Sequence, residues 1–496
     1  MKYWLSKSRY CKGVQCPKML WMDENMLEQA DDVVPEHIVK TGTHVGEIAR
    51  SYFGDFELVE YLEDKTEMAS ITTHLIGSGA ENIAEASFVY DELYCAVDIL
   101  HKTGDEWDIV EVKSSTEVTD IYMDDMSFQY YVLSNCGIKI HRVYNLHIDN
   151  SYVRNGKLEL DKLFVLEDCT EEVVQRSYLV EERIRQIREY VNAQTEPVKD
   201  IDCCCEKPYE CAYKRYCSRH VPEESVFNLA RMQTKKKYEL YHKGIITYEQ
   251  ILEHADKINA NQRRQVESVV FHKPDEVVFD EIDAFLQTLT YPIYHLDFET
   301  FQQAIPEYDG CRPYEQVPFQ YSLHIEYEDE TLEHKEFLAK EGTDPRRMLA
   351  ERLVMDIPMD VCVTAYNMSF EKTVLRNLAS LFPDLAEHLM NIHDCIHDLM
   401  IPFQKHYYYS AAMQGSYSIK YVLPALWPGD PELDYHNLEM VHNGQEASSL
   451  FADLINYSQD EIDVMRMNLL KYCQLDTYAM VKVLKKLKEV ARRTGK

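Results

Sequence analysis

Residues 92–115 read ELYCAVDILHKTGDEWDIVEVKSS. The segments 92–100 and 106–115 are rich in apolar and β-branched residues, and HKTGD between them supplies a turn. The stretch therefore predicts a β-hairpin. Residues 119–135 and 171–194 have helical patterns, the second an amphipathic helix, and IKIHRVYNLHID (138–149) predicts a further strand. Alternating strands and helices indicate an α/β fold.

The predicted hairpin carries three charged residues that can act together. Asp98 ends the first strand, and Glu111 and Lys113 are two residues apart on the second, which places both on one face. Carboxylates bind Mg²⁺ or Mn²⁺, and a nearby lysine can orient or deprotonate a water that attacks phosphorus. The alternative interpretation is a salt bridge across the hairpin.

The sequence around this triplet resembles the RecB-like branch of the PD-(D/E)XK nucleases. EVK (111–113) follows IV and an acid-terminated strand, and the next predicted helix carries Gln129 and Tyr131. TGTHVGEIAR (41–50) resembles the helical histidine motif of that branch. The resemblance implies that Asp98, Glu111 and His44 bind metal, that Lys113 and Gln129 take part in catalysis, and that Tyr131 contacts nucleic acid.

Five cysteines lie in DCCCEKPYECAYKRYC (202–217), and CPKMLW (16–21) supplies another near the start. In a cytoplasmic protein such clustered thiols are metal ligands before they are disulfides. Some RecB-like nucleases hold an iron–sulfur cluster with one cysteine before the nuclease core and three after it. This resemblance implies a [4Fe–4S] cluster on Cys16, Cys205, Cys211 and Cys217.

Several alternatives to this cysteine assignment stay open. Cys11 competes with Cys16 as the upstream ligand, although the Pro-Lys after Cys16 fits the family pattern. Cys203 and Cys204 are set aside, because adjacent residues cannot easily join one cluster. A structural zinc site is the second choice, since the spacing is longer than the usual C-x2-C. Oxidation-prone surface thiols are a third interpretation.

A second set of acidic residues occupies the C-terminal part of the chain. YPIYHLDFET (291–300) predicts a buried strand with Asp297 and Glu299 on one face. AYNMSFEKTVL (365–375) contains Asn367 and Glu371, and YCQLDTYAM (472–480) contains Tyr472 and Asp476. In order and spacing these motifs resemble the DnaQ-like DEDDy exonucleases of the ribonuclease H-like fold.

That resemblance implies roles for each of these residues. Asp297, Glu299, Glu371 and Asp476 would hold two cations about 4 Å apart. Tyr472 would orient the attacking water, and Asn367 would contact nucleic acid. The second motif usually ends in Asp, whereas this chain has Glu371, whose longer reach changes where a metal would be placed. Asp394 and Asp398 are interpreted as cap or network residues.

The region between these two motif sets is helical and polar. YHKGIITYEQI (241–251) places Gly244 between two helical patterns and faintly resembles a helix-hairpin-helix turn. A plain helix connection with a glycine cap explains the same pattern. Lys235, Lys236 and Lys237 are either a track for a nucleic-acid backbone or a solvated face.

Composition limits the class of protein. With 496 residues and 45% hydrophobic content, the chain is long enough for two large domains and a small third. The net charge of −33 argues against a simple basic nucleic-acid binder, although bound metal ions invert the local charge. We found no signal peptide and no apolar run near the roughly 20 residues of a membrane span. We therefore expect a cytoplasmic protein without a membrane partner.

These inferences combine into one prediction. We expect an α/β protein with a RecB-like nuclease domain at 1–220, a helical region at 221–288 and a DnaQ-like exonuclease domain at 289–496. This order of parts resembles a bacterial family of unknown function. It implies a metal-dependent nuclease that acts on single strands or ends of DNA, with one site being a 3′-5′ exonuclease, in repair, recombination or defence.

Two other functions fit the same motifs. One is a nucleic-acid-binding scaffold whose sites are inactive, and the other is an exonuclease that acts on RNA. No helicase motif or P-loop is present, so any unwinding requires a partner such as a helicase.

Overall fold

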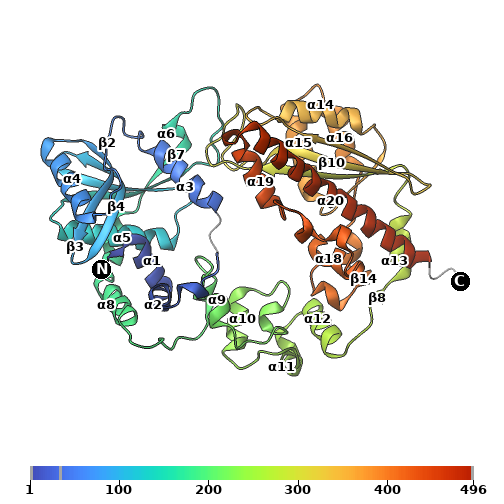
Figure 1. Cartoon of the computed structure of the whole chain (residues 1–496), viewed down its shortest axis with the longest axis horizontal. Coiled ribbons are helices and arrows are strands. Elements are labelled where there is room, and N and C mark those ends of the chain that lie inside the picture. The colour runs from blue at the N-terminus through green and yellow to red at the C-terminus, as the bar shows by residue number, and fades with distance from the viewer. Residues whose placement is uncertain (1–3, 33–35, 493–496) are drawn as a thin grey trace. The chain divides into compact units, whose positions relative to one another are not determined.

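The computed structural model describes residues 4–32 and 36–492, which form two compact units of mixed α/β structure (Figure 1). The first unit contains the residues up to Val221 together with Gln303–Glu315. The second contains Pro222–Gln302 and the residues from Gln316 onward. No helix in the described ranges is both long and apolar enough to cross a membrane.

The first unit is built on a mixed sheet in the order β2-β3-β4-β5-β6-β7, with β1 paired to β4. Its strands are β1 (Leu5–Ser6), β2 (Glu57–Leu58), β3 (Asn82–Tyr90), β4 (Leu93–Thr103), β5 (Glu106–Lys113), β6 (Ile140–Ile148) and β7 (Phe164–Asp168). The antiparallel pairing of β4 with β5 confirms the predicted hairpin. Strand β6 then pairs with β5 in parallel.

Helices cover both faces of this sheet. They are α1 (Lys7–Gln15), α2 (Pro17–Asn25), α3 (Glu36–Ala49), α4 (Lys65–Ser78), α5 (Asp120–Asn135), α6 (Leu160–Leu163), α7 (Thr170–Ser177), α8 (Val180–Val191) and α9 (Lys214–Cys217), with short 3-10 turns η1 (Leu27–Gln29) and η2 (Cys203–Cys205). One apolar core includes Val97 and Ile109 from the sheet with Phe128 from α5. Another core, against α3, includes Ile99 and Val110.

The predicted single helix at 171–194 is wrong, because the structure has two helices, α7 and α8, there. The break falls at Tyr178 and Leu179, whose side chains are exposed. Helix α7 packs on α5 and β6, whereas α8 packs on α1 and α2. The two halves therefore change direction to reach different partners.

The segment Gln303–Glu315 belongs to the first unit although the residues on either side of it belong to the second. Ala304 and Ile305 are buried in the core that includes Val45 and Ile99. The Tyr314 hydroxyl donates a hydrogen bond to the Ser114 carbonyl, just after β5. The segment therefore completes one face of the first unit.

The second unit contains a five-stranded sheet in the order β11-β10-β9-β12-β13. Its strands are β9 (Ile293–Phe301), β10 (Val317–Glu326), β11 (Leu332–Leu338), β12 (Cys362–Ala365) and β13 (Ile396–Asp398), and β8 (Glu276–Val277) pairs with β14 (Tyr408–Tyr409) separately. Strands β11, β10 and β9 are antiparallel, whereas β9, β12 and β13 are parallel.

The helices of the second unit place the long α20 against the centre of the sheet. They are α10 (Thr234–Tyr241), α11 (Tyr248–Glu253), α12 (Ala260–Val270), α13 (Phe279–Leu286), α14 (Arg346–Asp356), α15 (Ser369–Leu381), α16 (Ala386–Asp394), α17 (Ile401–Gln404), α18 (Ile419–Leu426), α19 (Gly444–Asp453) and α20 (Gln459–Arg492). Short 3-10 turns are η3 (Val226–Asn228), η4 (Ala255–Lys257), η5 (Ala411–Met413), η6 (Pro431–Leu433), η7 (Tyr435–Asn437) and η8 (Leu454–Asn456). In Figure 1, α20 (dark red) runs along the sheet that contains β10.

Alternation along β9 separates core from site. Tyr294, Leu296 and Phe298 pack into a core with apolar residues of α14, α15 and α16. The intervening residues, including Asp297 and Glu299, therefore point to the other face, where α20 packs.

Gly244 ends α10 in a left-handed conformation, with φ of 76°. The Gly244 N–H donates to the Tyr241 carbonyl, and the Ile245 N–H donates to the Leu240 carbonyl. Both backbone amides are used in capping the helix, which agrees with the plain glycine-cap interpretation. Lys237 donates a hydrogen bond to the Phe227 carbonyl, so it acts within the fold.

Candidate functional site

The first acidic cluster forms where β4 and β5 separate. Their pairing ends at Ile99 and Val110, and the Asp98 Oδ2 atom accepts a hydrogen bond from the Val112 N–H at 2.7 Å. Glu111 is 1% exposed, and Lys113 donates to its Oε1 atom at 2.6 Å. Asp98, Glu111 and Lys113 thus converge as predicted.

Helix α5 adds one face to this cluster. Gln129 donates to Glu111 Oε2 at 2.7 Å and to Asp125 Oδ1 at 3.0 Å. Lys113 donates to Asp125 Oδ2 at 3.0 Å, and its ammonium lies 5.1 Å from the Tyr122 ring centroid. Sequence reasoning missed Tyr122 and Asp125. Asp125 and Gln129 follow Tyr122 by three and seven residues, which places all three on one face of the helix. This spacing could have revealed Tyr122 and Asp125.

A second lysine completes the first acidic cluster and was also missed. The Lys7 Nζ atom donates to both carboxylate oxygens of Glu111 at 3.0 Å and to Asp98 Oδ1 at 3.4 Å. Burial alone would lower the pKa of Lys7, but the charges of Asp98, Glu111 and Asp125 raise it well above its ordinary value. For Lys113 as well, burial would lower the pKa, but the charges of the same carboxylates raise it above its ordinary value.

In this arrangement the first acidic cluster does not fit a divalent cation. Each Glu111 oxygen accepts two donors, from Lys7 and from either Lys113 or Gln129. One Asp98 oxygen is bonded to the backbone and the other faces Lys7. The side chains present therefore satisfy the carboxylates without a metal ion.

Two residues predicted for this site, His44 and Tyr131, do not contact the first acidic cluster through the hydrogen bonds and ion pairs of the described residues. His44 is exposed on α3, and within the described ranges it is not a hydrogen-bonding partner of the cluster. Tyr131 packs against Tyr90 with ring centroids 6.4 Å apart. A separation of two residues turns Tyr131 to the opposite side of α5 from Gln129, which explains its different surroundings.

The second acidic cluster consists of Asp297, Glu299, Glu371 and Asp476. The first two come from β9, Glu371 from the first turn of α15, and Asp476 from the middle of α20. Ligand atoms of Asp297, Glu299 and Cys473 all lie within 4.8 Å of one another. Burial, followed by repulsion from the other carboxylates, raises the pKa of Asp297 and Glu299 well above their ordinary values.

The pKa values of the other two carboxylates, Glu371 and Asp476, are raised as well. Burial raises the pKa of Glu371 to about 8, and Asp398 adds repulsion. Burial also raises the pKa of Asp476 to about 6, although hydrogen bonds from Tyr435 and Tyr472 and the charge of Lys420 oppose the shift. In the described chain, no lysine or arginine forms an ion pair with any of the four carboxylates.

This second acidic cluster does fit a hard divalent cation. Glu371 is 2% exposed, and its Oε2 atom is buried without a hydrogen-bond partner. A buried carboxylate oxygen without a donor is costly unless a cation compensates it. Oxygen ligands of this kind suit Mg²⁺ or Mn²⁺. Cys473, by contrast, is a neutral neighbour, because burial raises the pKa of its thiol well above the ordinary value.

Two tyrosines border the second acidic cluster, one predicted and one missed. Tyr472 is 4% exposed and lies one helical turn before Asp476 on α20. The Tyr435 hydroxyl donates to Asp476 Oδ1 at 2.6 Å, and the two tyrosine rings are 6.0 Å apart. Burial and nearby carboxylates raise the pKa of both phenols, so both remain donors. Because Tyr435 is 41 residues from Asp476, no local motif could reveal it.

Asn367 has φ of 69° in the turn between β12 and α15, and its side chain is exposed. The Asn367 N–H donates to Asp398 Oδ1 at 2.9 Å, and the Met368 N–H donates to Asp398 Oδ2 at 3.3 Å. Asp398 therefore fixes this turn, in agreement with its interpretation as a network residue. Asp394 bonds to the neighbouring His393 on α16.

The segment around Cys16 is hydrogen-bonded directly to the cysteine-rich segment 202–217. Gln15 donates to the carbonyls of Cys204 and Tyr209, both at 2.7 Å. The Cys204 thiol is within hydrogen-bonding reach of both Cys16 and Cys205, and this interaction lowers the pKa of Cys16 to about 6 and that of Cys205 to about 7. Cys204, which was set aside, thus lies between two of the predicted ligands.

The four predicted cysteine ligands are buried or half-buried, and burial raises the pKa of Cys211 to about 12 and also raises that of Cys217. Thiolates around one zinc ion lie about 3.8 Å apart in a tetrahedron with 2.3 Å bonds. Among the described residues, these cysteines do not form a group of three ligand atoms within 4.8 Å. Sulfur donors of this kind suit a soft metal centre.

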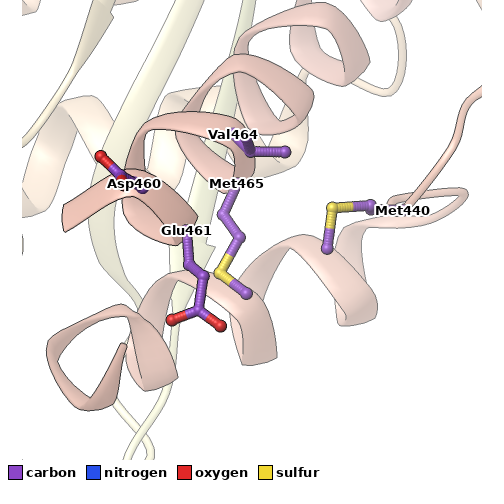
Figure 2. A pocket seen from close by; sticks show the side chains of 5 residues that line it. All are labelled: Met440, Asp460, Glu461, Val464 and Met465. Atoms are coloured by element: carbon purple, nitrogen blue, oxygen red, sulfur yellow. The ribbon is translucent and has the colours of Figure 1, made fainter. Parts of the chain in front are cut away.

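A cavity of about 300 Å³ lies beside the start of α20 (Figure 2). Figure 2 shows Met440, Val464 and Met465 around it, with Asp460 and Glu461 on the helix. Its apolar lining includes none of the four carboxylates, so it is separate from the second acidic cluster.

Comparison with curated proteins and with solved structures found no match. One part of the chain does match a known family, and that part contains Asp297, Glu299 and Glu371 of the second acidic cluster. The matching residues are 294–418, and the family is described as Domain of unknown function (DUF2779).

Proposed function

We propose that this chain is a metal-dependent nuclease that hydrolyses phosphodiester bonds of DNA at the second acidic cluster. The observation that carries the proposal is a set of four buried or half-buried carboxylates from three elements that act on one another's charge and form no ion pair with a described lysine or arginine. Buried carboxylates whose pKa values are raised by burial and by one another are typical of functional sites. The resemblance of their motifs to DnaQ-like exonucleases favours removal of nucleotides from a 3′ end.

The protein residues would share the work as follows. Asp297, Glu299, Glu371 and Asp476 would hold Mg²⁺ or Mn²⁺, which supplies charge stabilisation and a more acidic water when bound. Tyr472, kept neutral by its surroundings, can donate a hydrogen bond that orients a water. Tyr435 holds one oxygen of Asp476 and so fixes the direction of that carboxylate.

Cleavage at the first acidic cluster, through Lys113, Asp98 and Glu111, stays a prediction that concerns a second activity. Its support is the hydrogen bond that Lys113 donates to Glu111 Oε1 at 2.6 Å. The carboxylates, however, are satisfied by ammonium and amide donors in this arrangement. We therefore assign the metal-dependent chemistry to the second acidic cluster first.

The proposal is tested with single-stranded DNA labelled separately at each end, in Mg²⁺ and in Mn²⁺. Asp297→Asn should reduce the rate at which the 3′-end ladder forms by about 100-fold or more, because it removes a carboxylate of the cation site. Lys113→Ala should leave this ladder intact and remove any other product. Glu387→Gln, an exposed acid on α16, is the matched control. A 3′ ladder that survives Asp297→Asn contradicts the proposal.

Two alternative functions are separated by the same assay. Matched DNA and RNA oligomers in competition distinguish a deoxyribonuclease from an RNA exonuclease, since the 2′-hydroxyl is the discriminating group. Tight binding without product in either metal supports a scaffold with inactive sites. A helicase or another repair or defence partner would have to supply any unwinding.

We also propose that Cys16, Cys205, Cys211 and Cys217 hold a [4Fe–4S] cluster that fastens the N-terminal helices to the end of the first unit. Gln15 already ties the same two segments together. Anaerobically purified protein should contain four iron atoms per chain and absorb broadly in the visible range. Cys16→Ser should lose the iron, whereas Cys395→Ser in the second unit should retain it. Stoichiometric zinc without iron contradicts this assignment.

A further inference from the structure

Lys7 reaches the first acidic cluster because of how the sheet begins. Strand β1 pairs in parallel with the start of β4, at Leu93 and Tyr94, where β5 no longer accompanies β4. Ser6 caps α1, and Lys7 is the first residue of that helix. The chain start thus delivers an ammonium group into the gap between β4 and β5.

Helix α1 is held firmly in this position. The Tyr10 ring stacks on Phe128 of α5 with centroids 4.7 Å apart. A Cβ atom added at Gly13 would lie 2.6 Å from Ile187 of α8, so the two helices are in close contact. The backbone of Lys7, as the first residue of α1, is therefore held in place within the first unit.

Charge balance gives this lysine a definite role. The carboxylates of Asp98, Glu111 and Asp125 face the ammonium groups of Lys7 and Lys113, which leaves one net negative charge. Without Lys7 the same groups carry two net negative charges, which one divalent cation would neutralise. The Lys7 Nζ atom is 3.0 Å from both Glu111 oxygens, so a cation bound to both oxygens would have to occupy the same space.

We propose that Lys7 is the resident cation of the first acidic cluster and that a divalent ion enters between Asp98 and Glu111 only when the Lys7 side chain leaves. The Lys7 side chain is 23% exposed, so a change of rotamer toward solvent opens the position while α1 stays in place. The two acidic clusters then differ in kind. The second requires a cation from solution, whereas the first carries its own.

The test measures binding of Mn²⁺ by the full chain, by electron paramagnetic resonance and by calorimetry. The parent is Asp297→Asn/Asp476→Asn, in which the second acidic cluster is disabled. In this parent, Lys7→Met should create one Mn²⁺ site per chain, with affinity at least tenfold above any site of the parent. Adding Asp98→Asn should remove that site again.

Three further variants make the result specific. Lys7→Arg keeps the charge and should behave as the parent. Lys7→Gln is a second neutral variant, so the comparison does not rest on one substitution. Lys12→Met removes the other α1 ammonium that binds a carboxylate, that of Asp23, and should create no site.

Two results would overturn the inference. One is a parent that already binds a Mn²⁺ ion which Asp98→Asn removes. The other is a set of folded Lys7→Met and Lys7→Gln proteins that gain no Mn²⁺ site. Binding by the chain with an intact second acidic cluster is measured separately, so failure of the proposed nuclease site leaves the Lys7 comparison readable.

Discussion

Glu371 has the feature that separates a functional carboxylate from a structural one, namely a buried oxygen without a donor. Its pKa is raised from 4.5 to about 8, so the folded protein keeps a proton that the unfolded chain loses above pH 4.5. The stability of the metal-free protein therefore falls as pH rises from about 4.5 to about 8.

Glu371→Gln removes this penalty, and we expect it to raise the free energy of unfolding by about 3 kcal/mol near pH 7.5 and by little near pH 4.5. The same change should abolish Mn²⁺ binding at the second acidic cluster. Urea unfolding in a chelator at several pH values measures the first effect and calorimetry the second. Glu387→Gln is the control, and an equal gain at every pH would contradict the explanation.

Tyr435 affects the protonation of Asp476. Its hydroxyl donates to Asp476 and favours the ionised carboxylate, whose pKa is about 6. In Tyr435→Phe the pKa of Asp476 should rise, and half-maximal Mn²⁺ binding should move up by about one pH unit. Mn²⁺ titrations between pH 5 and 8 measure this shift. Tyr457→Phe, which changes an exposed tyrosine, should leave the pH dependence of Mn²⁺ binding unchanged.

Residues within one strand or helix were predictable, and residues brought from a distance were not. Asp297 and Glu299 share a face because strands alternate, and Tyr472 and Asp476 share one because helices turn every 3.6 residues. Lys7 lies 104 residues from Glu111, and its position depends on the pairing of β1 with β4. Nothing in the local sequence specifies that pairing.

At the scale of elements, the hairpin of β4 and β5, helix α5 and strand β9 followed from apolar periodicity and a turn signal. The break between α7 and α8 did not, because it depends on which partner each half packs against. Local pattern thus predicts that a helix forms, whereas packing determines where it bends.

The contact between β10 and α20 contains a histidine that should make the second unit sensitive to acid. The His324 Nδ1 atom lies 2.8 Å from the Thr477 hydroxyl oxygen, and His295 and His334 are its charged neighbours when protonated. Burial, with their repulsion, lowers the pKa of His324 from 6.5 to about 3. The unfolded chain then binds the extra proton, so stability falls as pH decreases from 6.5 toward 3.

We expect this histidine to account for about 2 kcal/mol of lost stability between pH 6.5 and pH 5. His324→Gln keeps a polar group beside Thr477 and should flatten the stability profile in that range. Chemical unfolding at each pH provides the measurement. His436→Gln, whose parent side chain is 93% exposed, serves as the comparison, and equal profiles for all three proteins would refute the assignment.

At the scale of the molecule, the main stretch of the first unit ends at Val221, and the domain types predicted on either side of it stay predictions. The helical residues 222–288 fall in the same unit as the C-terminal sheet. The return of Gln303–Glu315 to the first unit was not predictable, because it depends on Ile305 and Tyr314 finding partners far back in the chain.

This return predicts how the chain responds to cutting. A protease site inserted between Val221 and Pro222 should yield two fragments that remain together, because Ile305 and Ala304 stay buried in the first unit. Size-exclusion chromatography under native conditions measures this. Ile305→Asp, which places a charge in that core, should release the fragments. If the fragments separate without this substitution, burial of Gln303–Glu315 is too weak to keep them associated, and the prediction is wrong.

The path of Gln303–Glu315 also affects how such a protein can be inherited. The chain passes between the units at three places, after Val221, after Gln302 and after Glu315. A single genetic exchange after Val221 or after Gln302 would separate the segment from the core it fills, and one after Glu315 would separate β9 from the rest of the second unit's sheet. The two units therefore cannot be shuffled as independent cassettes, and lineages that carry one should carry both in this order.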